Sequence, residues 1–310
     1  MIYFNNQIIF PEDFRVPNYS ISPFSTEKLA DLNTIVTSEN LSDQERFLSE
    51  EFGNHEFFMS AKKAIFKALS FYDLQKNDEV YIVTTTGNTY VSSCVTKEIE
   101  KYCKWSRTLS DNTKLLFVIH EFGTICKDLE SLSKLNIPII EDFAMSLFSE
   151  QDLKAKNYSD FKIYSLPKFF PVQFGGVLKY NNDTFLPENG LENQEYFQLD
   201  LKKIAHHFLL KKEQIITKRK TNYAFYQKAM TGLDAQCTLE LSDNETPSVY
   251  MFSSDSIDLD GLKIFLQKNG IECSKFYGQN SFFLPVHQYL EEFDINYIVN
   301  LIKYFAYENK

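Results

Sequence analysis

The sequence predicts an α/β fold in which a large, mostly parallel sheet is covered by helices on both faces and is followed by a smaller C-terminal α/β unit. From about residue 56, short apolar runs alternate with segments of helical periodicity at the spacing of βαβ units. The apolar runs are nearly uninterrupted, as expected for strands buried on both faces. With 310 residues, 44% of them hydrophobic and 15% aromatic, the chain can bury a core of this size, and a fully disordered chain is excluded.

The elements of the large domain follow one another up to about residue 181. A helix is expected over 57–70, where Ala and Lys give high helix propensity, and a buried strand is expected over 78–86. In chain order, the further predicted elements are a helix over 91–102, a short segment over 104–109, a strand over 113–120, a helix over 126–136, and strands over 137–143, 161–166 and 175–181. A loop rich in Asn, Glu and Gly over roughly 181–195 ends this alternation.

The rest of the chain is expected to form a connector and a smaller unit. Residues 199–230 predict one long helix with apolar residues on one side and lysines on the other. The elements expected after it are a strand over 248–253, a helix over 258–270 with Gly270 at its C-cap, a strand over 271–278 and a last helix from Asp294. We therefore expect a large domain over 1–198 that includes an N-terminal arm, a connecting helix over 199–230 and a small domain over 231–310.

Charge and cysteine content limit the functional classes. A net charge of −10 argues against binding to the phosphates of nucleic acid. The five cysteines are odd in number and form no CxxC pair, which favours reduced thiols in a cytoplasmic protein over a disulfide framework or a metal site. Neither a secretion signal nor a run of about 18 apolar residues is seen, so we expect no membrane partner.

Chemically useful side chains follow three of the predicted strands. The turn TTTGNTY follows the strand over 78–86, Glu141 and Asp142 end the strand over 137–143, and Lys168 comes shortly after the strand over 161–166. Ligands bind at the carboxyl ends of the strands in an open α/β sheet. A lysine opposite a buried aspartate suits pyridoxal 5'-phosphate (PLP), because the amine forms a Schiff base and the carboxylate keeps the pyridine nitrogen protonated. Free N–H groups at a helix start and nearby hydroxyls would hold its phosphate.

The order of these motifs resembles the DegT/StrS-like family of sugar aminotransferases, which are fold type I PLP-dependent enzymes. The resemblance runs from about residue 55 to 230 and more loosely to the end of the chain. The stretches that carry it are SAKKAIFKALSFYDLQKNDEV, TTGNTYVSS, VIHEFGTICKDLESLSKLNIPIIEDFAMS and SLPKFFPVQFGGVL. It implies a seven-stranded main sheet, PLP as the cofactor and a homodimer with active sites at the subunit interface. It also implies amino transfer from a donor such as glutamate to a keto sugar, carried on a nucleotide, in polysaccharide or glycan biosynthesis.

The resemblance also implies roles for single residues. Lys168 would be the Schiff-base lysine and proton shuttle, and Asp142 would hold the pyridine nitrogen. The other implied positions are Tyr90 stacked on the ring, Ser165, Ala61 and Lys62 at the phosphate, Met145 near the ring hydroxyl, Gly175 and Gly176 turning the backbone away from the cofactor, and His120 and His287 on the substrate side.

Several departures from the family pattern motivate a second hypothesis. Met145 replaces a Gln or His, and its thioether cannot make the same hydrogen bond. Ala61 replaces a glycine, Ser165 stands three residues before the lysine rather than five, and QEYFQLD stands in place of an Asn-Tyr-Arg motif. The usual sugar-binding insertion between FYGQNS and LPVHQYL is missing. The alternative is a catalytically degenerate member that acts as a binding or scaffold protein. Sugar dehydration is disfavoured, since related dehydratases carry histidine in place of Lys168.

Simpler interpretations stay open for single residues. Asp142 could be a helix N-cap, and Tyr90 is one of many aromatic residues in a chain with 18 Tyr and 29 Phe. His120 could equally be a strand-end histidine with internal partners. His206 and His207 are expected in a core or an interface, and the charged run KKEQIITKRK on a solvated helix face.

Overall fold

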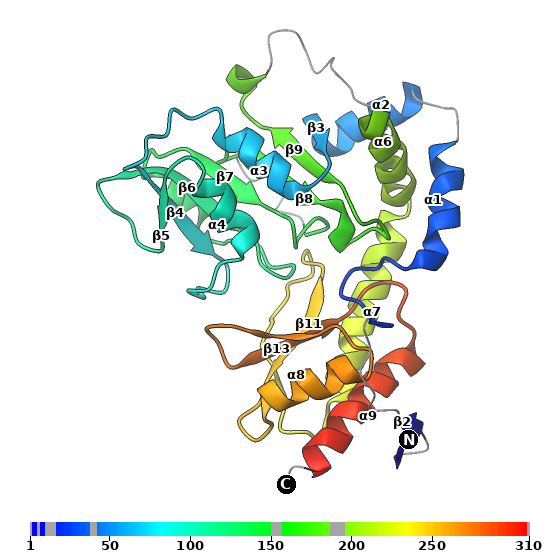
Figure 1. Ribbon diagram of the computed structural model, residues 1–310. Coiled ribbons are helices and arrows are strands. Elements are labelled where there is room, and N and C mark those ends of the chain that lie inside the picture. The colour runs from blue at the N-terminus through cyan, green and yellow to red at the C-terminus, as the bar shows by residue number, and fades with distance from the viewer. Residues whose placement is uncertain are drawn as a thin grey trace. The chain divides into compact units, whose positions relative to one another are not determined.

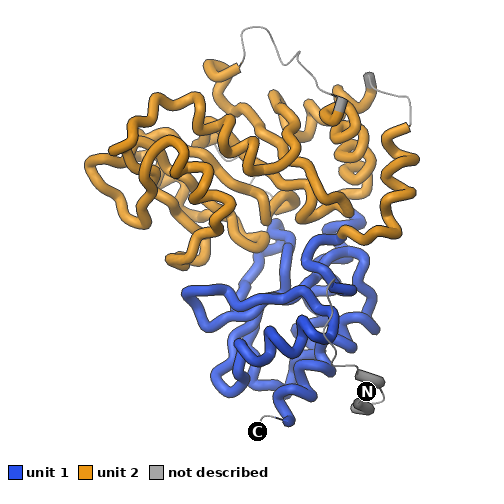
Figure 2. Tube along the Cα trace, viewed as in Figure 1, with its two compact units in different colours: residues 1–23, 213–310 blue, residues 24–212 orange. Residues whose placement is uncertain are grey.

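The computed structural model describes residues 2–4, 7–9, 17–37, 42–149, 157–186 and 196–308. The chain forms two compact units (Figure 2): unit 1 comprises Met1–Pro23 and Glu213–Lys310, and unit 2 comprises Phe24–Lys212. Among the helices of the described ranges, none combines the length and the apolarity that crossing a membrane requires.

A seven-stranded sheet forms the centre of unit 2 (Figure 1). In spatial order its strands are β3 (Asn54–Phe58), β9 (Gly176–Tyr180), β8 (Phe161–Ser165), β7 (Ile139–Asp142), β6 (Thr113–Ile119), β4 (Glu79–Thr84) and β5 (Lys104–Ser106). From β8 to β5 all neighbours pair in parallel, while β9 runs antiparallel to both of its neighbours. The predicted mostly parallel sheet is thus confirmed.

Helices cover both faces of this sheet, and the sequence of β6 shows why. Leu115 and Phe117 face one side and Leu116 and Val118 the other, and all four are fully buried. The first pair packs with α3 (Ala61–Leu69) and α4 (Ser93–Ile99), and the second pair packs with α5 (Leu129–Ser133). The other helical segments of this unit are η1 (Thr26–Lys28), α1 (Leu29–Val36), α2 (Ser42–Phe52), η2 (Leu166–Lys168), η3 (Asp183–Phe185) and α6 (Tyr196–Leu209).

The predicted helix over 57–70 was wrong at its start. Phe57 and Phe58 belong to the edge strand β3, where they pair with β9. The helix begins only at Ala61, after Ser60 in an extended conformation. Sheet pairing therefore outweighs local helix propensity in the first residues of this segment. The predicted helix over 126–136 is likewise reduced to α5.

The predicted long helix over 199–230 is two helices. α6 ends at Leu209 and α7 (Lys212–Ala229) begins three residues later, so two residues separate them. The division between the two compact units falls between Lys212 and Glu213, and residues 1–23 group with the C-terminal part. These boundaries differ from the expected ranges 1–198, 199–230 and 231–310, whose functional assignment stays a prediction.

Unit 1 contains the smaller sheet that the sequence predicted. Its strands, in spatial order, are β10 (Gln236–Cys237), β11 (Val249–Ser253), β13 (Ser281–Pro285) and β12 (Ser274–Phe276), and all pairs are antiparallel. The helices of this unit are α7, α8 (Leu259–Lys268) and α9 (Glu292–Glu308), and β1 (Ile2–Phe4) pairs with β2 (Gln7–Ile9). Strand β13 was not predicted. Gly270 has a positive φ of 77° and directly follows the C-cap residue Asn269, as expected for a helix end.

Candidate active site

The strand ends singled out in the sequence meet at one edge of the large sheet. Strand β7 ends at Asp142, which pairs with Ile163 on the adjacent parallel strand β8. Strand β8 ends at Ser165, three residues before Lys168. On the other side, Ile119 at the end of β6 pairs with both Asp142 and Thr84 at the end of β4. The lysine loop, the aspartate and the TTTGNTY turn therefore all leave the sheet at its carboxyl edge.

Lys168 lies on a short loop that also carries two fully buried aromatic side chains. It ends the 3₁₀ turn η2, in which Pro167 occupies the start. Phe169 and Phe170 follow it, both fully buried, and their backbone N–H groups donate to Leu166 O at 3.0 and 2.8 Å. Phe148 packs against both rings at 5.2 and 5.9 Å between centroids. Lys168 itself is only half-buried, so a tightly packed apolar base carries a lysine that is partly exposed to solvent.

The adjacent glycines bring this loop against the start of α3. Gly175 has a φ of 120°, which a side chain rarely allows, and its N–H donates to Met59 O at 2.9 Å. Gly176 pairs with Ser165, and a Cβ at this position would lie 2.5 Å from the Ala61 nitrogen. Only glycine lets strand β9 approach the helix start this closely.

The start of α3 has an electrostatic arrangement that an anion would stabilise. Ser60, the N-cap residue, makes no side-chain capping bond, and the first turn contains no acidic residue. Instead, Lys62 and Lys63 follow Ala61 there. Cations near a helix N-terminus oppose the helix dipole, whereas backbone N–H groups at this end favour a phosphate.

Asp142 is a buried carboxyl group with capacity for one more strong partner. It is 4% exposed, and its Oδ1 accepts a hydrogen bond from Ala144 N at 2.8 Å. Its Oδ2 accepts none from the described part of the chain. Burial raises the pKa of Asp142 to about 6, although the bond from Ala144 acts in the opposite direction. Such a group favours a positively charged hydrogen-bond donor, which would offset the cost of burying its charge.

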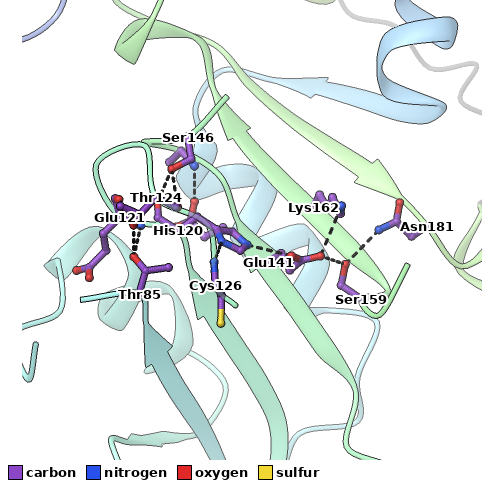
Figure 3. Close-up of polar contacts among 12 residues, drawn as sticks. Thr85, His120, Glu121, Thr124, Cys126, Glu141, Ser146, Ser159, Lys162 and Asn181 are labelled. Atoms are coloured by element: carbon purple, nitrogen blue, oxygen red, sulfur yellow. Dashed lines mark hydrogen bonds and ion pairs between the residues drawn. The ribbon is translucent and has the colours of Figure 1, made fainter. Parts of the chain in front are cut away.

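Behind Asp142, on the opposite face of β7, lies a buried line of polar side chains (Figure 3). His120 Nδ1 accepts from Cys126 N at 3.0 Å, so the proton of the neutral ring lies on Nε2, which donates to Glu141 at 2.9 Å. Glu141 also accepts from Ser159 at 2.5 Å and lies 3.7 Å from the Lys162 ammonium group. Burial alone would raise the pKa of Glu141, but these partners lower it to about 2. The line joins the ends of β6 and β7 behind the site.

Both predicted substrate-side histidines lie in protein interiors. His120 is fully buried, with both ring nitrogens engaged as described, and its ring lies 3.9 Å from that of Phe143. His287 belongs to unit 1, where it is buried and accepts from Tyr289 N at 3.2 Å. Burial and the neighbouring Arg219 lower the pKa of His287 to about 3. His120 is therefore a strand-end histidine with internal partners, which was the simpler of the two interpretations of the sequence.

The remaining predicted residues lie on turns at the carboxyl edge. Tyr90 is half-exposed in the turn after β4, and Met145 is half-buried in the turn that follows Asp142. Two further side chains, Arg107 and Glu121, hold the first of these turns and were not predicted from the sequence. The only signal for Glu121 was an acid directly after a strand-end histidine.

These features fit PLP on observations of this chain alone. The buried carboxylate of Asp142 suits a protonated pyridine nitrogen, and the uncapped, lysine-bearing start of α3 suits a phosphate. Lys168 follows the strand next to Asp142, where it would supply the amine. Ser165, whose side chain makes no capping bond, pairs with Gly176 on the strand that contacts this helix start.

Comparison with known proteins agrees with this arrangement. Residues 45–225 match the profile of a family described as "Putative PLP-dependent aminotransferase". No curated protein matches the chain. The aminotransferase TlmJ from Streptoalloteichus hindustanus superimposes with a TM-score of 0.73 at 14% identity, covering 97% of this chain and 99% of that chain.

Two further solved structures share the fold. The PLP form of "Putative sugar aminotransferase Spr1654" from Streptococcus pneumoniae has a TM-score of 0.72 at 15% identity, covering 98% of this chain and 100% of that one. A DegT DnrJ EryC1 StrS aminotransferase from Brucella abortus has a TM-score of 0.69 at 15% identity, covering 90% and 96%. At these identities the likeness establishes the fold, and it confirms the fold type I architecture expected from the motifs. Since the family profile spans more than half of its length, the chain belongs to this family of aminotransferases that depend on pyridoxal phosphate.

Proposed function

We propose that the protein transfers the amino group of an amino acid such as glutamate to a keto sugar, carried on a nucleotide, during polysaccharide or glycan biosynthesis. The observation that carries the proposal is the placement of Asp142 and the Lys168 loop at the ends of adjacent parallel strands, beside an open helix start. The sugar aminotransferase named among the fold neighbours and the order of the sequence motifs support the choice of substrate class.

Each residue of the site has a task in this reaction. When bound, PLP supplies an aldehyde that condenses with amines and a ring that accepts electrons. Lys168 Nζ would anchor the cofactor and, when released, take a proton from the carbon that bears the amino group and return it two atoms away, which is a 1,3-proton shift. The Asp142 carboxylate would keep the pyridine nitrogen protonated. Ser165, Ala61 and Lys62 would bind and orient the phosphate.

Further parts of the proposal come from the motif resemblance. Tyr90 would cover one face of the cofactor ring, and Met145 would lie near its hydroxyl group without a hydrogen bond. The resemblance also implies a substrate-side role for His287, which in unit 1 is buried. A homodimer and a cytoplasmic location complete the proposal, the latter supported by five free cysteines.

The two half-reactions test this function separately. Purified protein with PLP should convert glutamate to its 2-oxo acid, and the aminated cofactor form should then react with at least one nucleotide-linked keto sugar in a panel. Lys168→Ala should abolish both half-reactions, whereas Lys114→Ala, which changes an exposed lysine on β6, should retain both. Reaction with 2-oxo acids but with none of the keto sugars would contradict the proposed substrate class.

A specific observation keeps a second candidate function in view. Met145 and Ala61 stand where the family has a polar side chain and a glycine. The second candidate is therefore a catalytically degenerate family member that serves as a binding or scaffold protein. In that case the protein would bind PLP but show no spectral change with any amino donor. A glutamate-driven spectral change would rule this alternative out.

A further inference from the structure

The turn between β4 and α4 is held by hydrogen bonds from two neighbouring segments. On one side, the Arg107 guanidinium donates to Ile82 O at 2.5 Å, to Thr84 Oγ1 at 2.7 Å and to Asn88 O at 2.6 Å. A planar, forked donor can reach three acceptors at once in a fixed geometry. Arg107 therefore ties the end of β4 to the middle of the turn.

On the other side, Glu121 holds the same turn from the end of β6. Its Oε2 accepts from the Thr86 hydroxyl at 2.5 Å and from the Thr86 N–H at 3.1 Å. Its own N–H donates to the Thr85 hydroxyl at 2.9 Å, and Thr124 donates to that hydroxyl at 2.6 Å; Figure 3 shows Glu121, Thr85 and Thr124 side by side. Glu121 is only 8% exposed, so these bonds form in a poorly hydrated place where they are strong.

The bonds continue along the turn to Tyr90. The Asn88 N–H donates to Thr86 Oγ1 at 3.3 Å, and the Tyr90 N–H donates to Asn88 Oδ1 at 3.2 Å. Packing contributes little at the tip, because a Cβ added to Gly87 would meet no atom within 4 Å, and Tyr90 itself is 46% exposed. Hydrogen bonds from Glu121 through Thr86, together with those from Arg107 and Thr84 to Asn88 O, thus hold the backbone that leads to Tyr90.

We propose that Glu121 is a positioning residue of the cofactor site. It acts through Thr86 and Asn88 to fix the turn that carries Tyr90, so that the aromatic ring is held in place before the cofactor binds. The inference rests on the proposed role of Tyr90 within the function stated above. A pre-ordered ring loses less conformational freedom on binding, and therefore binds its partner more tightly. Removing the acceptor would leave two donors of Thr86 without their partner and release the turn.

A double-mutant cycle on PLP binding tests this coupling. Glu121→Leu removes the acceptor at similar size, Glu121→Gln keeps an acceptor oxygen, and Tyr90→Ala removes the ring. The dissociation constant of PLP is measured by quenching of Trp105, the only tryptophan of the chain, which lies on β5 of the same sheet. Glu130→Leu, on an exposed residue of α5, is the matched control.

The proposal predicts that Glu121→Leu weakens PLP binding about tenfold and shifts the visible band of the bound cofactor, while Glu121→Gln recovers most of the affinity. In the Tyr90→Ala background, Glu121→Leu should weaken binding by less than about twofold, because its effect runs through the ring. If Glu121→Leu fails to fold, Thr86→Val breaks the same bond from the other side and takes its place in the cycle.

Fully additive losses in the double variant would overturn the proposal, and so would unchanged PLP binding in Tyr90→Ala. Loss of affinity in Glu130→Leu equal to that in Glu121→Leu would show a general effect of removing a carboxylate and would also overturn it. Since the cycle measures the cofactor alone, inactivity toward every keto sugar would contradict the proposed substrate class and leave this inference standing.

Discussion

Replacing Asp142 by asparagine should stabilise the cofactor-free protein while it destroys the cofactor site. Asparagine has the same shape, and its carbonyl oxygen can still accept the hydrogen bond from Ala144 N. What changes is the charge. Burial raises the pKa of the carboxyl group from 3.8 to about 6 in the folded protein, so folding makes the ionised form less favourable.

The sign and size of the effect follow from proton linkage. Between pH 3.8 and about 6 the folded protein binds more protons at Asp142 than the unfolded chain does. The free energy of unfolding therefore falls as the pH rises through this window. A difference of about 2 pKa units at 1.36 kcal/mol each gives a loss of about 3 kcal/mol by neutral pH. The asparagine variant has no charge to bury, so its free energy of unfolding does not fall in this way.

The assay is urea unfolding of the PLP-free proteins, followed by the fluorescence of Trp105, at several pH values. Near about pH 4 the wild-type protein and Asp142→Asn should have similar stability, and at about pH 7 the variant should be more stable by up to about 3 kcal/mol. Added PLP should stabilise the wild-type protein strongly and the variant weakly. Asp111→Asn, on an exposed residue of the same unit, should show no such pH-dependent gap. A variant that is equally stable or less stable at neutral pH would refute the reasoning.

Two further predictions follow from buried groups. Burial and Arg219 lower the pKa of His287, so between about pH 7 and about pH 5 the unfolded chain binds a proton there that the folded protein does not bind. The wild-type protein should therefore lose about 2 kcal/mol more of its free energy of unfolding over this range than His287→Gln does, as measured by urea unfolding. Equal pH slopes of the two proteins would contradict this. Gly176→Ala should cost about 1–3 kcal/mol and weaken PLP binding, since its Cβ would lie 2.5 Å from the Ala61 nitrogen. Gly232→Ala, where φ is 88° but a Cβ meets nothing within 4 Å, should also cost stability and yet leave PLP binding unchanged in the same titration.

The positions of most strands of the large sheet along the chain were predictable, because buried strands are unusually apolar. The runs that became the parallel strands β4, β6, β7 and β8, and the antiparallel strand β9 beside them, stood out for this reason. The edge strand β3 did not, since its burial is partial and a helix with good propensity follows it directly. The break between α6 and α7 carries neither glycine nor proline, so no local signal marked it.

The placement of the candidate residues at the carboxyl edge was predictable where a motif follows a strand, while their roles stay predictions. Asp142 ends one apolar strand and Lys168 shortly follows the next, so both could be placed at the edge where ligands bind. The roles of Glu121 and Arg107 depend on contacts between segments that are distant in sequence, such as the 35-residue separation between Thr86 and Glu121. Sequence periodicity does not reveal such contacts. His120 shows the converse, since its position at a strand end suggested the pocket while its partners Glu141 and Cys126 lie inside the protein.

The site depends above all on one amine, and its attachment can be measured directly. The protein is incubated with PLP, reduced with borohydride and digested, and the peptide that carries the reduced cofactor is identified by mass spectrometry beside a Lys168→Ala sample. We expect the label on Lys168 of the wild-type protein, together with a visible absorption band that the variant lacks. Label on a different lysine, or a wild-type protein that stays colourless and unlabelled, would contradict the account.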